Sequence, residues 1–200
     1  MKQGLALFDF DGTLTTQDSL LEFIKYSCGS FRYYLVMALF SPVIFYHTVI
    51  SKDGEQAKQR LLSFLFKGLK ESELESLGAA FAEKVLPKIE RAEMMDVLRD
   101  MKKHGYRIVV ISASISIWLK PWTDSLGVEL ISTEFEFKNG TFTGRFATPN
   151  CNGTEKVARI KKHLNVMDYS PIYAYGNSKG DLPMLALADF PFMNNLPLEK

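Results

Sequence analysis

Two aspartates one residue apart follow a short apolar run near the start of the chain. Asp9 and Asp11 come directly after residues 5–8, and Gly12 follows them. Such a run is typical of a buried strand, which would carry both carboxylates to its carboxyl end. In open parallel α/β sheets, ligands bind at that end. Because neighbouring carboxylates repel each other, we expect a divalent cation or a held proton between them, with Gly12 allowing a sharp turn.

A second candidate site follows the β-branched run 106–111. Ser112 and Ala113 come directly after that run, and a hydroxyl with adjacent backbone amides at a strand end can hold a phosphoryl oxygen. The alternative is a serine that caps a helix beginning near Ser114. From these residues alone, the capping role is favoured.

A lysine and a polar loop lie further along the chain. Lys156 is at the opening of a helix expected over 154–164, with Thr154 as its cap. A cation there can neutralise a transferring phosphoryl group, whereas the alternative is a solvated surface lysine. Asn177 and Asp181 follow the apolar run 172–175, where the carboxyl end of a further strand is expected.

The elements that would position these residues alternate between strands and helices. Their expected ranges are strands at 5–10, 106–111, 128–131, 172–175 and 190–193, a hairpin around Asn139-Gly140, and helices at 154–164 and 182–188. This alternation predicts an α/β fold with a doubly wound parallel sheet. The helical stretch from 19 to about 101 is too long for one crossover. We therefore expect an α/β core of residues 1–17 and 98–200 and a helical cap of residues 18–97.

Taken in order, these groups resemble the four signatures of the haloacid dehalogenase (HAD) superfamily, specifically its phosphotransferase majority. The run from Asp9 to Thr15 is similar to the first signature and Ser112 to the second. Lys156, in a Gly-x-x-Lys pattern, is similar to the third, and residues 176–185 to the fourth. No P-loop or dinucleotide fingerprint competes with this order. The resemblance implies a HAD-like Rossmannoid core with a helical cap inserted after the first strand.

The resemblance also implies a role for each residue. Asp9 would be the nucleophile that forms an aspartyl-phosphate, and Asp11 would protonate the leaving oxygen and later deprotonate the attacking water. Asp11 also argues against dehalogenation, because members that cleave carbon–halogen bonds lack this second aspartate. The implied phosphate contacts are Gly12, Thr13, Ser112, Ala113 and Lys156. The implied Mg²⁺ ligands are Asp9, Asp11 through its backbone carbonyl, Asn177 and Asp181.

One position departs from the family's pattern. The fourth signature usually reads Gly-Asp-x-x-x-Asp, and Asn177 replaces its first acid. An amide oxygen still suits Mg²⁺, but one negative charge is lost, so we expect weaker metal binding. This replacement is also the main support for a different class of function, a non-catalytic module that binds a membrane or a partner on the same fold.

The sequence defines the substrate less clearly than the chemistry. Phosphoserine phosphatases share the early helical cap, but they carry a glutamate where this chain has Asp18, and they use a cap arginine for the substrate carboxylate. Lys58 and Arg60 lie in the corresponding region without a secure register, and surface positions suit them equally well. The apolar cap is similar to the branch that contains a bacterial phosphatidylglycerophosphate phosphatase. A lipid-like phosphomonoester is therefore a further candidate.

The segment 31–50 is unusually apolar for a cap. It carries one charge, Arg32, and is nearly long enough to span a bilayer, although Pro42 would break or kink it. Three interpretations compete: two cap helices that meet at Ser41-Pro42 and pack on the core, an apolar substrate channel or membrane-surface face, and a membrane span. The sequence favours the first.

Composition sets the remaining expectations. With 46% hydrophobic residues and a net charge of +1, the 200-residue chain suits a core domain with an insert and no nucleic-acid partner. Cys28 and Cys151 have no metal-type spacing and suit a reducing compartment, and the early aspartates argue against a signal peptide. We predict a cytoplasmic, Mg²⁺-dependent phosphatase for a small or lipid-like phosphomonoester, with peripheral membrane contact through residues 31–50 as an alternative. A phosphoserine phosphatase-type metabolite enzyme is the second candidate.

Overall fold

The computed structural model describes residues 2–50 and 54–198. Within them, six strands form one sheet in the order β3-β2-β1-β6-β7-β8, and β4 and β5 form a separate hairpin. Their bounds are β1 (Gln3–Phe8), β2 (Arg107–Ile115), β3 (Glu129–Thr133), β4 (Phe135–Lys138), β5 (Thr141–Phe146), β6 (Tyr169–Gly176), β7 (Phe190–Met193) and β8 (Leu196–Pro197). β1, β2, β3, β6 and β7 pair in parallel, and β8 pairs antiparallel to β7. The predicted parallel α/β sheet is confirmed.

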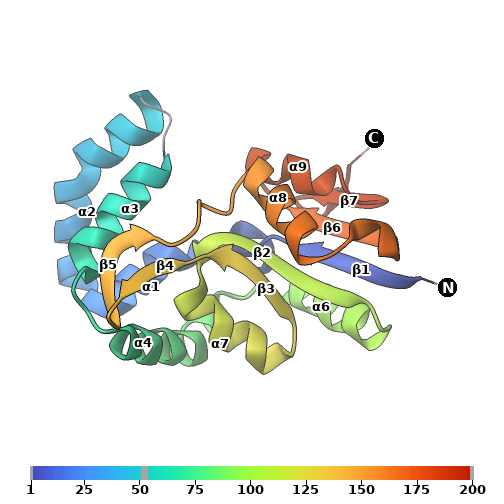
Figure 1. Ribbon diagram of the computed structural model, residues 1–200, viewed down its shortest axis with the longest axis horizontal. Helices are drawn as coiled ribbons and strands as arrows, with labels where there is room; N and C mark the ends of the chain where they lie inside the picture. The colour runs from blue at the N-terminus through green and yellow to red at the C-terminus, as the bar shows by residue number, and fades with distance from the viewer. Residues whose placement is uncertain (1, 51–53, 199–200) are drawn as a thin grey trace.

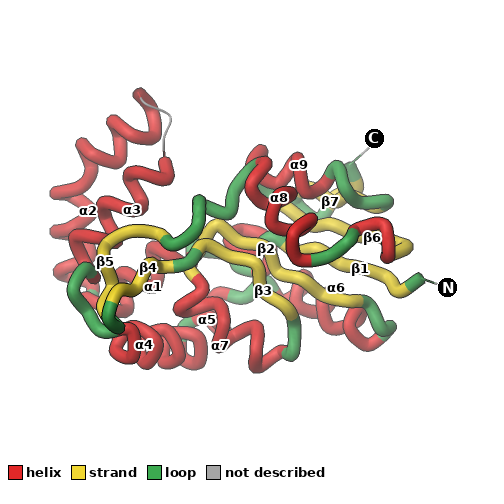
Figure 2. The backbone as a smooth tube through the Cα atoms, viewed as in Figure 1, coloured by secondary structure: helices red, strands yellow, loops and turns green. Residues whose placement is uncertain are grey.

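Helices flank the sheet and also build a lobe at the carboxyl ends of its strands (Figures 1 and 2). Their bounds, with short helical turns as η, are η1 (Phe10–Leu14), α1 (Ser19–Cys28), α2 (Ser30–Phe45), η2 (Tyr46–Ile50), α3 (Gly54–Phe66), α4 (Glu71–Lys84), α5 (Leu86–Ile89), α6 (Ala92–Lys103), α7 (Ser116–Leu126), α8 (Thr154–His163), η3 (Val166–Asp168), η4 (Lys179–Asp181) and α9 (Leu182–Leu185). The lobe consists of α1 to α4 with the hairpin β4–β5.

The central strand β1 sends its side chains alternately into two buried clusters. Ala6 and Phe8 join a cluster that includes residues of α6 and α7, whereas Leu5 and Leu7 join one that includes residues of α8 and α9. Successive strand side chains point to opposite faces, so an unbroken apolar run predicts a strand that is covered on both sides. Because β2 lies on one side of β1 and β6 on the other, the strand order reverses at β1, where open α/β sheets bind ligands.

The predicted hairpin is confirmed, and it packs on the helical lobe. Asn139 and Gly140 have φ values of 52° and 70°, the left-handed conformation that a tight two-residue turn requires. The backbone N–H of Phe142 donates to the carbonyl of Leu69 at 2.9 Å, and Phe142 accepts from Gly68 at 3.0 Å. The lobe thus includes a segment from the second half of the chain. The division into residues 18–97 and the two core segments stays a prediction.

Some local predictions are wrong. α2 continues through Pro42, so two helices do not meet at Ser41-Pro42. Proline removes one intrahelical hydrogen bond, and packing of the inner side of α2 on the buried cluster offsets that loss. Thr154 is the first residue of α8 rather than its cap, and Gly153, with φ 59°, precedes it without a side-chain bond.

No helix within 2–50 and 54–198 is both long enough and apolar enough to cross a membrane.

Candidate active site

The carboxyl ends of three adjacent strands bring the predicted residues together. Asp9 follows β1, Ser112 lies in β2 and Asn177 follows β6. β1 pairs directly with both β2 and β6, and the backbone N–H of Asp9 donates to the carbonyl of Tyr175 at 2.9 Å. Three segments that are far apart in the sequence therefore end beside one another.

Lys156 is the hub of this site. Its ammonium donates to Asp9 Oδ1 and to Asp181 Oδ1, both at 2.6 Å, and to the carbonyl of Ile111 at 3.1 Å. Thr13 Oγ1 donates to Asp9 Oδ2 at 2.9 Å. Lys156 is 1% exposed, so the alternative of a solvated surface lysine is wrong. One buried cation therefore holds two carboxylates, one directly after β1 and one in η4, the turn that follows β6.

The charges of this cluster perturb one another. Burial raises the pKa of Asp9, and the positive charge of Lys156 offsets only part of that rise. Burial alone would lower the pKa of Lys156, but the charges of Asp9 and Asp181 outweigh it and raise that pKa. For Asp181, the effect of burial is outweighed by Lys156 and by hydrogen bonds, so its pKa is lowered. Lys156 therefore stays protonated, whereas the charged form of Asp9 is destabilised by burial.

Asp181 fixes the loop that carries Asn177. Its second oxygen, Oδ2, accepts from the backbone N–H groups of Asn177 at 3.2 Å and Ser178 at 2.9 Å, and from Ser178 Oγ at 2.8 Å. A Cβ at Gly176 would lie 2.5 Å from the Cβ of Asp181, so only glycine fits there. Both Asp181 oxygens already accept hydrogen bonds, and direct ligation of a metal by Asp181 stays a prediction.

Asp11 lies in a second buried network that the sequence did not reveal. Its Oδ1 accepts from the backbone N–H of Ser19 at 2.6 Å, and its Oδ2 accepts from Ser114 Oγ at 2.5 Å. Ser19 Oγ donates to Ser114 Oγ, and Trp118 Nε1 donates to Ser19 Oγ, each at 3.1 Å. Burial raises the pKa of Asp11 to about 6, while Ser114 opposes the rise. The position of Ser114, two residues after Ser112, was the available sequence signal.

Ser112 and Ala113 lie at the carboxyl end of β2. Ser112 is 1% exposed, and its Oγ accepts from the backbone N–H of Ser114 at 2.9 Å. Because α7 begins at Ser116 with no side-chain cap, the alternative in which Ser112 caps that helix is wrong. The carbonyl of Ala113 accepts from Thr133 Oγ1 at 2.7 Å and from Lys58 Nζ.

Lys58 connects the helical lobe to this strand end. It extends from α3 and donates to the carbonyl of Ala113 and to Asn150 Oδ1, the latter at 3.2 Å. Burial lowers its pKa to about 8, although Asp11 opposes the shift. Arg60 is exposed, and Asp18 caps α1 by accepting from the backbone N–H of Leu21 at 3.1 Å. A surface position is thus correct for Arg60 and wrong for Lys58.

Gly12 and Asn177 face each other across the first turn. Gly12 has a φ of +81°, and a Cβ there would lie 2.1 Å from Asn177 Nδ2. Arg91 secures the turn by donating to the carbonyls of Gly12 and Thr13, both at 3.2 Å. A cavity of about 250 Å³ borders Gly12, Thr13, Arg91 and Asn177. The sequence-predicted phosphate contacts of the first motif therefore lie beside Asn177.

The oxygen atoms at this place suit a hard divalent cation. Asp9 provides a carboxylate, Asn177 an amide oxygen and Asp11 a backbone carbonyl, and Mg²⁺ prefers such ligands. Within the described residues, no three His, Cys, Asp or Glu side chains form a metal-binding group. A metal would therefore depend on Asn177 and on main-chain oxygen as well as on carboxylates. A cation would also stabilise Asp9, whose negative charge is disfavoured by burial.

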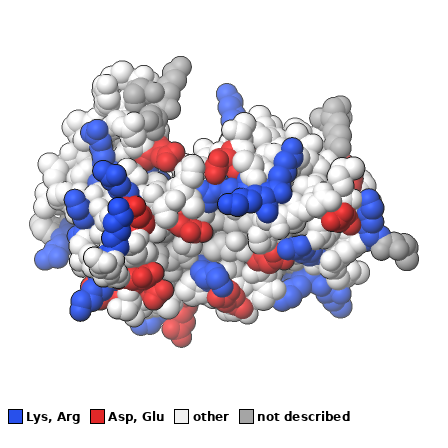
Figure 3. All heavy atoms as spheres, in the orientation of Figure 1, with Lys and Arg blue, Asp and Glu red and all other residues white. Residues whose placement is uncertain are grey.

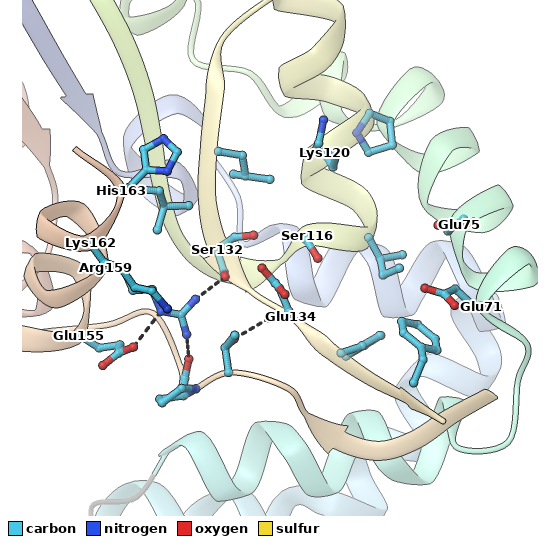
Figure 4. A pocket seen from close by; sticks show the side chains of 18 of the residues that line it. Glu71, Glu75, Ser116, Lys120, Ser132, Glu134, Glu155, Arg159, Lys162 and His163 are labelled. Atoms are coloured by element: carbon cyan, nitrogen blue, oxygen red, sulfur yellow. Dashed lines mark hydrogen bonds and ion pairs between the residues drawn. The ribbon is translucent and has the colours of Figure 1, made fainter. Parts of the chain in front are cut away.

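A larger groove lies elsewhere on the molecule (Figure 4). It has a volume of about 1020 Å³ and lies between α4, α7, β3 and α8. Arg159 crosses one end of it and donates to the carbonyls of Ser132, at 2.6 Å, and Pro149, while Glu155 accepts from its Nε at 2.8 Å. None of the sequence-predicted site residues lines this groove, so it is separate from the cluster around Lys156.

A family described as haloacid dehalogenase-like hydrolase matches residues 6–186. The chain belongs to this family. Protein CicA from Caulobacter vibrioides is 32% identical over 187 residues, which make up 92% of this chain and 83% of CicA. The prediction of an enzyme of the HAD superfamily is confirmed.

Solved structures share the fold over nearly the whole chain. A protein of unknown function from Bordetella pertussis Tohama I has a TM-score of 0.79 and 25% identity, over 96% of this chain and 90% of its own. A phospho-aspartyl intermediate analogue of phosphoserine phosphatase has a TM-score of 0.57 and 22% identity, over 95% of this chain and 85% of its own. These structures share the HAD-like fold of this chain.

Proposed function

We propose that this HAD-family hydrolase cleaves phosphomonoesters through an aspartyl-phosphate at Asp9 and depends on Mg²⁺. The single observation that carries the proposal is the buried hub, in which Lys156 holds Asp9 and Asp181 at 2.6 Å each. A buried, fully paired lysine beside a carboxylate at a strand end is suited to a reaction that moves negative charge on a phosphoryl group. The intact acid Asp11 beside this hub argues against a purely binding role.

In the first step, an oxygen of Asp9 attacks phosphorus, and the bond from phosphorus to the ester oxygen breaks. The leaving oxygen takes a proton from Asp11, whose pKa of about 6 keeps a protonated fraction available near neutral pH. Ser112 and Lys156 hold the phosphoryl oxygens. Thr13, which donates to Asp9 Oδ2, fixes the orientation of the attacking carboxylate.

In the second step, a water molecule attacks phosphorus and displaces Asp9. Asp11 takes the proton from this water, so it returns to its starting state, and orthophosphate leaves. Mg²⁺, when bound, supplies positive charge that aligns the phosphoryl oxygens and offsets their negative charge. Asp9, the backbone carbonyl of Asp11 and the amide oxygen of Asn177 would hold it. Asp181 would support the metal by fixing the loop of Asn177.

We place a small or lipid-like phosphomonoester with a second anionic group in this site. The second anionic group is proposed because the positively charged side chain of Lys58 extends from the lobe to the strand end, where it donates to the carbonyl of Ala113. Phosphoserine and phosphatidylglycerophosphate both have an anionic group besides the phosphomonoester. Of these, phosphoserine is named in the description of the phosphoserine phosphatase structure above, and it is the second candidate substrate.

The test is orthophosphate release from a panel that contains phosphoserine and a short-chain phosphatidylglycerophosphate, with Mg²⁺ and with a chelator. We expect release that requires Mg²⁺ and is abolished in Asp9→Asn. The matched control is Asp168→Asn, which changes an exposed aspartate remote from Lys156 and should retain activity. Full activity of Asp9→Asn would refute the covalent step, and full activity in chelator would refute the metal requirement.

Asn177 is tested by restoring the missing acid. Asn177→Asp adds a carboxylate where we propose an amide ligand, so the Mg²⁺ concentration for half-maximal activity should fall. An unchanged Mg²⁺ requirement would remove Asn177 from the metal site.

A further inference from the structure

The outer side of α2 and η2 exposes an unusual number of large apolar side chains. Most of them recur three or four residues apart, which places them on one side of the helix. No residue of α2 is buried. The exposed members of this stripe, called here the outer face, are Phe31, Tyr34, Leu35, Leu39, Phe45, Tyr46, Val49 and Ile50, which are between 51% and 84% exposed.

The outer face is too large to be an ordinary apolar patch. Side chains of this size at these exposed fractions present on the order of 800 Å² together, whereas patches on monomeric proteins are typically a few hundred Å². The inner side of α2 is apolar as well, because Tyr33, Val36, Met37 and Phe40 pack on the core cluster. A helix that is apolar on all sides needs cover on all sides. α2 has cover on one side.

Positive charge accompanies the outer face. Along α2, η2 and α3 the sequence contains the basic residues Arg32, Lys58 and Arg60 and one acid, Glu55, and of these Lys58 is directed to Ala113 instead. Arg32 lies on α2 itself. On α3, Arg60 is exposed and lies one turn before Phe64. The ring of Phe64 packs on the ring of Phe40 of α2, with 5.0 Å between the ring centroids. Glu55 accepts from the backbone N–H of Asn150 at 3.3 Å and thus points toward the strand ends.

The figures place this face on the outside of the molecule. α2 lies at the edge of the helical lobe that is furthest from the sheet (Figure 1). In the same orientation, the surface over α2 is mostly uncharged, with basic groups beside it (Figure 3). The face is therefore accessible to a large, flat partner without displacement of any described element.

We propose that the outer face docks on the surface of an anionic lipid bilayer. Apolar and aromatic side chains on one helix side, with basic groups at its border, are the features of helices that lie in the membrane interface. Anionic lipids attract the basic groups. A second copy of this chain would bring the same positive charges against each other across a two-fold interface, so charge favours lipid over self-association. The proposal does not depend on the proposed hydrolysis.

Co-sedimentation with vesicles tests the proposal. The full chain should sediment with vesicles of phosphatidylcholine and phosphatidylglycerol, and less with phosphatidylcholine alone or at high salt. Leu35→Gln with Leu39→Gln should lower the partition coefficient at least tenfold, because both leucines are more than 60% exposed on the outer face. Arg32→Glu with Arg60→Glu should lower it roughly tenfold on the anionic vesicles.

The control is Met167→Gln, which changes a 74% exposed apolar residue outside the lobe and should leave vesicle binding unchanged. All variants should keep wild-type hydrolysis of a water-soluble ester and wild-type circular dichroism, because none alters the site around Lys156. Vesicle binding that is absent in the wild type, or equal in wild type and the leucine variant, overturns the proposal. So does a stable dimer that the leucine variant dissociates. Each result is independent of whether phosphate is released.

Discussion

Lys58 offers a direct test of how the helical lobe meets the strand ends. Its ammonium is desolvated against Ala113 and Asn150, and burial lowers its pKa from 10.5 to about 8. The unfolded chain therefore binds this proton more tightly than the folded chain does. Between pH 8 and pH 10.5, unfolding takes up a proton, so the free energy of unfolding rises with pH. Lys58→Met removes this titration and keeps most of the side-chain volume.

The magnitude follows from the difference in pKa. The difference between 10.5 and about 8, at about 1.4 kcal/mol per pKa unit, corresponds to about 3 kcal/mol of destabilisation while Lys58 is charged in the fold. That full effect applies below pH 8. At pH 9.5 the folded form is mostly neutral and the unfolded form mostly charged. The wild type should therefore gain about 2 kcal/mol between pH 7 and pH 9.5 relative to Lys58→Met.

The assay is urea unfolding of both proteins at several pH values in this range. The comparison between wild type and variant cancels the titration of cysteines and tyrosines that both share. Lys161→Met, at an exposed position of α8, is the control and should show a flat difference from wild type. A flat difference for Lys58→Met would refute the reasoning, because it would mean that the lobe does not desolvate Lys58.

Three further predictions concern other parts of the site and the lobe. Ser114→Ala removes a hydrogen bond that stabilises the charged form of Asp11, so the pKa of Asp11 should rise above about 6 and the corresponding limb of the pH–rate profile should move to higher pH. Gly78→Ala should destabilise the fold by about 1–3 kcal/mol in urea unfolding, because its Cβ would lie 2.2 Å from the carbonyl oxygen of Ile117. Lys156→Met should abolish activity and cost about 3–5 kcal/mol of stability at pH 7, by leaving two buried carboxylates without their cation. Part of that stability should return at pH 5, where the carboxylates can be protonated.

The first of these has a matched control, and each has a contradicting result. Ser116→Ala, at the start of α7, should leave the pH–rate profile in place, and an unshifted profile in Ser114→Ala would separate that serine from Asp11. Wild-type stability of Gly78→Ala would contradict the close approach of α4 to α7. For Lys156→Met, equal loss of stability at pH 5 and pH 7 would show that packing rather than charge stabilises the hub.

Several features could be predicted from the sequence because they are local. The apolar run before Asp9 predicts a covered strand, since a strand buried on both faces needs no alternation. The Asn139-Gly140 pair predicts a tight turn, because both residues tolerate a positive φ. The order of the motifs then places Asp9, Ser112 and Asn177 at neighbouring strand ends. Each of these inferences needs only the chain within a few residues and the rule that parallel strands end on one side.

Other features depended on tertiary packing. Pro42 predicts a break in α2, yet the helix continues, and the side chains on its inner side pack on the buried core cluster. A lysine is usually exposed, so neither the half-buried Lys58 nor the buried Lys156 could be recognised from its own segment. The burial of Lys58 depends on the contact between its side chain and Ala113 of β2, a strand that is distant from α3 in the sequence.

By itself, the sequence determined the strand pattern, the family and the identity of the catalytic candidates. Only the tertiary structure decided how charge is arranged around them. Lys156 and Asp9 are separated by 147 positions, and they pair because α8, which carries Lys156, packs on the sheet face that holds Leu5 and Leu7 of β1. Local sequence specifies backbone conformation, whereas the burial and pairing of a charge are properties of all the segments that surround it. Electrostatics of the site therefore follow from the fold.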